Sequence, residues 1–195
     1  KPPNIAPPYE AATMQTGIRL DDVLATHKAD ELNMDSVQED PPRNLLGVSV
    51  ELVIAALDAG AAASCILDEL YKGHRFLRRF DPAESRMSII SYKCAKSESD
   101  GWTLDEHAFL SAISSARAFA IDFLWLDSWS YRKTPYVHSD FVTTLTVVML
   151  NTHHVVWLPR SRKSVAGLYQ YRLWCTFEAA MVSLRSEVTV SIGGY

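Results

Sequence analysis

Short apolar runs alternate with helical stretches over the second half of the chain. The apolar runs, which we interpret as strands, are residues 88–92, 123–127, 154–158 and 188–192. The helical stretches between them are residues 104–118, 141–151 and 171–184. Continuous apolar strands are typical of sheets that are covered on both faces. The alternation therefore predicts an open parallel α/β sheet with right-handed crossovers.

A helical pattern precedes this region. One helix face is indicated by apolar residues at i, i+3, i+4 and i+7, namely Val50, Val53, Ile54 and Leu57. Ser49 is a suitable N-cap, and the pattern continues to Lys72, where Gly73 can end it in the left-handed cap conformation. We expect one long helix or two abutting helices. Residues 44–84 are thus predicted to be a helical segment, followed by the α/β domain at 85–195.

The first 43 residues have a different composition. Residues 1–42 contain six of the nine prolines and eight Asp or Glu against three Lys or Arg. Proline fixes φ and has no N–H to donate, so we expect an acidic, extended arm at 1–43 with at most a short helix around 20–32. This arm could lie along its own domain, bind a partner or remain solvated.

Charge and cysteine content exclude several classes of protein. The formal net charge of -4 argues against a nucleic-acid partner, because such domains usually carry a basic face. The apolar stretch 45–67 contains Glu51 and Asp58, so we interpret it as a buried helix and expect no membrane span. Three widely spaced cysteines predict neither a disulfide framework nor a metal site, and they favour an intracellular compartment, which otherwise stays open.

The helix expected at 171–184 holds the strongest candidate chemistry. Trp174 and Glu178 are four residues apart and share a helix face, with Arg172 beside it. An aromatic ring next to a carboxylate and a guanidinium can stack a base and bind a ribose or a phosphate. The alternative is structural, with Trp174 in the core and Glu178 paired with Arg172.

Other candidate residues follow from the expected sheet. Ligands bind at the carboxyl ends of the strands in open α/β sheets, so Tyr92, Lys93, Asp127, Ser128 and the loop at Pro159 should share one rim. The neighbours His153 and His154 would point to opposite faces of a strand, so we expect no metal ligation by the pair. Residues 74–80 are locally basic and predict a solvated helix face or an acid-pairing surface, with an anion site as the alternative.

Five sequence blocks, in order, resemble a heterokaryon-incompatibility (HET) domain. They are Ile90-Ser91-Tyr92, residues 112–117, residues 124–128, residues 155–158 and Arg172-Leu173-Trp174 with Glu178. The same blocks are similar to Toll/interleukin-1 receptor (TIR) domains. In those domains the first strand ends Ser-Phe-Arg, here Ser91-Tyr92-Lys93, and the catalytic helix carries Trp-Cys-x-x-Glu, here residues 174–178. Both families have a flavodoxin-like architecture, so the resemblance implies a flavodoxin-like open parallel sheet.

The TIR resemblance also implies an activity. Glu178 would be the catalytic carboxylate, which holds the nicotinamide-side ribose of NAD and assists cleavage of the glycosidic bond. The implied substrate-binding residues are Trp174, Arg172, Ser91, Tyr92, Lys93 and Asp127. NAD would be a substrate, with no cofactor or metal expected.

Two functions follow as hypotheses. The first is a HET/TIR-like module that acts in protein assembly or signalling, through protein partners or self-association, with NAD-type nucleotide cleavage as its chemistry. The second is a catalytically inert structural subunit of a larger complex, which keeps the fold and is anchored by the arm at 1–43.

Overall fold

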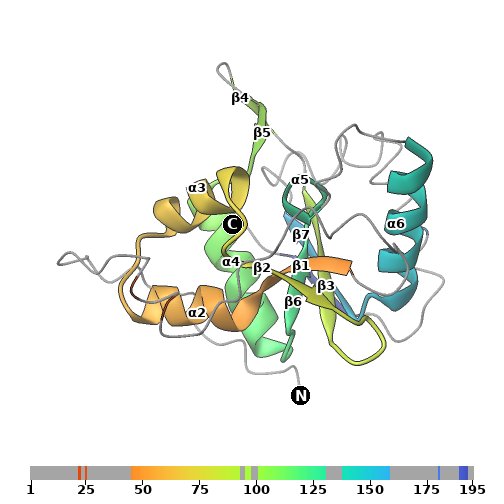
Figure 1. The fold of residues 1–195 in the computed structure, drawn as a ribbon, viewed down its shortest axis with the longest axis horizontal. Helices are drawn as coiled ribbons and strands as arrows, with labels where there is room; N and C mark the ends of the chain where they lie inside the picture. Colours follow the sequence, from red (N-terminus) through yellow and green to blue (C-terminus); the bar gives the residue numbers. More distant parts are fainter. Residues whose placement is uncertain are drawn as a thin grey trace.

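The structure is a computed structural model with helices on both faces of a central sheet. It describes residues 45–92, 95–97, 101–130, 138–158 and 189–192, together with Asp22, Ala25 and Ala180. The helices are α2 (Val50–Asp58), α3 (Ala63–Lys72), α4 (Glu106–Ala118), α5 (Asp127–Ser130) and α6 (His138–Asn151). Figure 1 shows α2, α3 and α4 on one side of the sheet and α6 on the other. The fold is therefore a layered α/β fold.

Within the described ranges, one sheet has six strands in the order β2-β1-β6-β3-β7-β8. Their bounds are β1 (Leu45–Ser49), β2 (Leu77–Phe80), β3 (Met87–Tyr92), β6 (Phe123–Trp125), β7 (His154–Leu158) and β8 (Thr189–Ile192). The pairs β6–β3, β3–β7 and β7–β8 are parallel, whereas β2–β1 and β1–β6 are antiparallel. The four strands that the apolar runs predict are confirmed, as is the mostly parallel α/β sheet.

The segment 44–84 contains more than the helices expected from its pattern. Helices α2 and α3 confirm the helical pattern, and β1 precedes them and β2 follows them, two strands that this pattern does not predict. Leu45 pairs with Phe80, and Val48 pairs with both Leu77 and Leu124. The five residues of β1 are all buried, because this strand lies between β2 and β6. Residues 45–80 therefore contribute directly to the same sheet as β3, β6, β7 and β8.

Two helices, and not one, follow β1. Ser49 caps α2, and its hydroxyl accepts a hydrogen bond of 3.4 Å from the Leu52 N–H. Gly60 then adopts a φ of 95°, a left-handed conformation that glycine tolerates, and α3 starts at Ala63. The expected left-handed cap at Gly73 was wrong, because this residue has φ -120° and ψ -168°, which is extended backbone.

Alternate residues of the strands face two separate apolar clusters. Ile90 of β3 and Val156 of β7 belong to the cluster beneath α2, α3 and α4, which also contains Phe109. Ile89 of β3 belongs to the cluster beneath α6, with Val148. A sheet with apolar side chains on both faces needs helices on both sides, and that explains the layered arrangement.

The arm at 1–43 and the helix expected at 171–184 lie outside the described residues, apart from Asp22, Ala25 and Ala180. A short hairpin of β4 (Ala95–Ser97) and β5 (Gly101–Thr103) follows β3 and projects from the end of the sheet (Figure 1). In the part of the chain that the structure describes, no helix has the length and apolar character needed to cross a membrane.

Candidate functional site

We call the side of the sheet where the parallel strands end the carboxyl edge, and the side where they begin the amino edge. The strand order creates a binding position at the carboxyl edge, between the ends of β3 and β7. These two strands are parallel neighbours, and Tyr92 at the end of β3 is in register with Leu158 at the end of β7. Along the chain, the strand of this sheet that follows β3 is β6, which lies beside β3 on the side away from β7. The described strand that follows β7 is β8, which lies beside β7 on the side away from β3. In open parallel sheets, ligands bind at the carboxyl ends of the strands where the chain connections diverge in this way.

Ser91 and Tyr92 lie at this position but in different environments. Tyr92 is half-buried and packs against the cluster that contains Ile90 and Leu158. Ser91 is on the opposite face of the strand and is only 1% exposed. Tyr92 is therefore the more accessible of the two residues, and Lys93, which follows them, lies outside the described residues.

Asp127 lies at the same edge, two residues after the end of the neighbouring strand β6, as the first residue of α5. Trp125 of β6 is in register with Ile89 of β3, so Asp127 and Ser91 each follow two residues later. The side chain of Asp127 is exposed, and its Oδ1 accepts a hydrogen bond of 2.7 Å from the N–H of Ser128. The structure thus brings Ser91, Tyr92 and Asp127 to one edge, as the order of the strands requires.

A buried tryptophan, Trp129, packs beneath the carboxyl edge directly after β6. Residues 127–130 form α5, and Trp129 on this short helix is 0% exposed. Its ring meets Tyr71 of α3 and Phe109 of α4 edge to face, with centroids 5.9 and 6.2 Å away. In the sequence, the signal for this burial is a tryptophan within an otherwise polar stretch.

Three of the candidate residues belong to the expected helix at 171–184. Arg172, Trp174 and Glu178 lie outside the described residues, as does Lys93. Their position relative to Tyr92 and Asp127 therefore stays a prediction from the sequence.

A second polar cluster lies at the opposite, amino edge of the sheet. His154 of β7 is 1% exposed, and its Nδ1 is 2.9 Å from the Oγ of Ser88 on β3. Its Nε2 is 3.4 Å from the Oγ of Ser115 on α4, and Phe119 stacks on the ring at 4.5 Å. Burial, with a smaller contribution from the Arg86 charge, lowers the pKa of His154 from 6.5 to about 4. The imidazole is therefore neutral at pH 7.

The two adjacent histidines have separate roles. The Nδ1 of His153 accepts a hydrogen bond of 3.4 Å from the Met87 N–H, whereas His154 contacts the two serines. Among the described residues, no group of three or more His, Cys, Asp or Glu side chains could hold a metal ion. The register of β3 and β7 pairs His154 with Ser88, and no local pattern indicates this contact.

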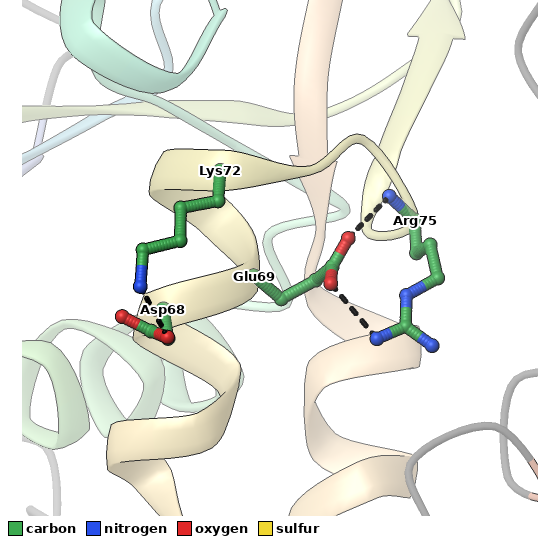
Figure 2. Close-up of polar contacts among 4 residues, drawn as sticks. All are labelled: Asp68, Glu69, Lys72 and Arg75. Atoms are coloured by element: carbon green, nitrogen blue, oxygen red, sulfur yellow. Dashed lines mark hydrogen bonds and ion pairs between the residues drawn. The ribbon is translucent and has the colours of Figure 1, made fainter.

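The basic segment 74–80 is neutralised in part by α3. Figure 2 shows the Glu69 carboxylate between the backbone N–H and the guanidinium of Arg75, at 3.4 and 2.8 Å. On the same helix, Lys72 pairs with Asp68, the residue before Glu69, at 2.7 Å (Figure 2). The acid-pairing interpretation is confirmed for Arg75. The helix-face interpretation was wrong, because residues 77–80 form the strand β2. This strand is the outermost one on its side of the described sheet.

Comparison of the chain with protein-family models, with curated proteins and with solved structures finds no match.

Proposed function

We propose that the chain is a flavodoxin-like domain of the HET/TIR type that binds an NAD-type nucleotide at the carboxyl edge between β3 and β7 and cleaves its glycosidic bond. One observation carries the proposal. Numbered along the chain, the four parallel strands β3, β6, β7 and β8 lie in the order 2-1-3-4, which agrees with four of the five strands in the flavodoxin-like order 2-1-3-4-5. In that fold the ligand site lies between the first and third strands, here β3 and β7.

The described residues at this edge suit a nucleotide. The half-buried ring of Tyr92 can stack on a base, and the exposed carboxylate of Asp127 can accept hydrogen bonds from ribose hydroxyls. Lys93, the next residue after Tyr92, would supply a positive charge for the phosphates, whereas Ser91, at 1% exposure, would support the edge from inside and not contact the nucleotide. These roles follow from the types of residue and from the edge that they share.

The proposed reaction is hydrolysis of the bond between nicotinamide and ribose. The C1′–N bond breaks, its electron pair leaves with nicotinamide, and water adds to C1′ and loses a proton to solvent, which gives ADP-ribose. The sugar passes through a positively charged, oxocarbenium-like state. A carboxylate beside this state stabilises it electrostatically, and Glu178 is the residue proposed for that role. Trp174 and Arg172, on the same expected helix, would form the wall of the pocket.

The test is release of nicotinamide from NAD by the purified chain, with Glu178→Gln as the variant. The matched control is Glu84→Gln, because Glu84 is an exposed glutamate in the turn before β3, at the amino edge. We expect wild type and the Glu84 variant to release nicotinamide, and the Glu178 variant to be at least about 100-fold slower. Equal rates in all three proteins would show that Glu178 is not the catalytic carboxylate.

A second candidate function is the inert structural subunit anchored by the arm at 1–43. It is favoured by the burial of two side chains at the carboxyl edge, because Ser91 is 1% exposed and Trp129 0% exposed. Neither side chain is accessible to a ligand. No nicotinamide release by folded wild-type protein, even at high concentration, would favour this candidate over the enzyme.

A further inference from the structure

The polar cluster at the amino edge has no part in the proposed reaction, but it connects three elements. His154 on β7 is held between the hydroxyls of Ser88 on β3 and Ser115 on α4. Its ring also stacks on Phe119, the residue that ends α4, with an angle of 25° between the planes. One imidazole therefore connects the end of α4 to two neighbouring strands of the sheet.

A neutral imidazole fits this position well. It has one N–H donor and one nitrogen acceptor, and a serine hydroxyl can serve as the partner of either. Both ring nitrogens can therefore be satisfied while the side chain is 1% exposed. Protonation changes both conditions, because it makes both nitrogens donors and places a positive charge in a buried site.

One charged group on the β3 side, Arg86, disfavours the protonated ring. Arg86, in the turn that precedes β3, lowers the pKa of His154 further beyond the effect of burial. Asp122, before β6, accepts a hydrogen bond of 2.8 Å from the backbone N–H of Arg86. The Asp122 carboxylate thus binds the backbone of Arg86, and the guanidinium of Arg86 opposes protonation of His154.

The other elements packed around the ring carry Glu106, His107 and Arg117, all on α4, and His153 directly before β7. On α4, Arg117 is exposed and follows Ser115 by two residues. His153, the residue before β7, accepts a hydrogen bond from the Met87 N–H with its own ring. The described part of β8 begins with uncharged Thr189, which is in register with His154.

We propose that Ser88, His154 and Ser115 form an acid-sensitive latch, which holds α4 against the sheet while the imidazole is neutral and releases it when the imidazole is protonated. The sign follows from linkage. The folded-state pKa of about 4 is below the unfolded value of 6.5, so the unfolded chain binds more protons between these pH values. The contribution of His154 to stability is complete above pH 6.5 and is lost as the pH falls toward 4.

The first test compares urea unfolding at pH 8 and pH 5 for wild type and His154→Gln. Over this range, the two pKa values correspond to an increase of about 30-fold in the unfolding equilibrium constant from His154 alone. Wild type should show this increase in excess of the Gln variant. The control is His107→Gln, because His107 is exposed on α4, and it should keep the wild-type dependence. Equal pH dependence in wild type and His154→Gln would overturn the proposal.

Two measurements on the wild-type protein keep the proposal testable if the variant does not fold. An NMR titration of the His154 ring should show a midpoint near pH 4, whereas a midpoint near 6.5 would overturn it. Amide hydrogen exchange, corrected for intrinsic rates, should show that α4 loses protection at pH 5 before α6 does. Equal losses in α4 and α6 would contradict a latch at α4.

Discussion

The hydroxyl of Tyr71, in the last turn of α3, accepts a hydrogen bond of 2.7 Å from the backbone N–H of Leu104, 33 residues later in the chain. The ring of Tyr71 also meets Trp129 edge to face. One side chain thus connects α3, the residue that precedes the α4 N-cap and the short helix α5. These contacts hold α3 and α5 together next to the carboxyl end of β6.

Replacing Tyr71 with Phe should remove the hydrogen bond and keep the ring contact. We expect a loss of about 1 kcal/mol in the free energy of unfolding, because the Leu104 N–H loses its acceptor. Tyr71→Ala removes both interactions and should cost about 2–4 kcal/mol. Urea unfolding measures both values. A Phe variant as stable as wild type would show that the hydrogen bond contributes nothing to folding.

Replacing Trp129 with Ala should leave a cavity between α3, α4 and α5. The side chain is 0% exposed, so we expect a loss of about 3–5 kcal/mol in the free energy of unfolding. Trp157 on β7 is half-buried, and Trp157→Ala is the matched control, with a smaller expected loss. If both variants lose the same stability, the packing of Trp129 between α3, α4 and α5 contributes no more to stability than the half-buried ring of Trp157.

Gly73 gives space to the carboxylate of Glu69. A Cβ atom at residue 73 would overlap Oε1 of Glu69, although the extended backbone there accepts any residue. Gly73→Ala should therefore displace this carboxylate from Arg75 and cost about 0.5–1 kcal/mol, partly offset by the lower entropy of the unfolded chain. Urea unfolding at low and high salt measures the effect, which should decrease at high salt.

A double-mutant cycle isolates this relationship between Gly73 and Glu69. In a Glu69→Ala background the overlap is absent, so Gly73→Ala should become neutral or stabilise the fold by about 0.4–1 kcal/mol. The same cost of Gly73→Ala in both backgrounds would mean that the glycine serves another purpose.

The sequence predicts the parallel part of the sheet because its strands are uniform apolar runs between helices. It does not predict β1 and β2. The apolar residues of β1 run directly into the helical pattern of α2, and the antiparallel pairs Leu45–Phe80 and Val48–Leu124 join residues far apart in the chain. Strand pairing of this kind has no local signal.

The candidate site could be predicted in the same partial way. The common edge of Tyr92 and Asp127 follows from parallel strands, which end on one side of the sheet. The burial of Ser91 depends on what packs against its face of β3, and the strand pattern alone does not specify this. The contact between Ser88 and His154 depends on the register of strands 66 residues apart, which a local pattern does not contain.

Binding of an NAD-type nucleotide at the carboxyl edge between β3 and β7 is tested most directly by amide chemical-shift mapping with NAD. We expect saturable shifts centred on Tyr92, Asp127 and Leu158, with the amides of Ser88 and His154 at the amino edge unchanged. No saturable shift at millimolar NAD, or shifts centred on the amino edge, would contradict the account.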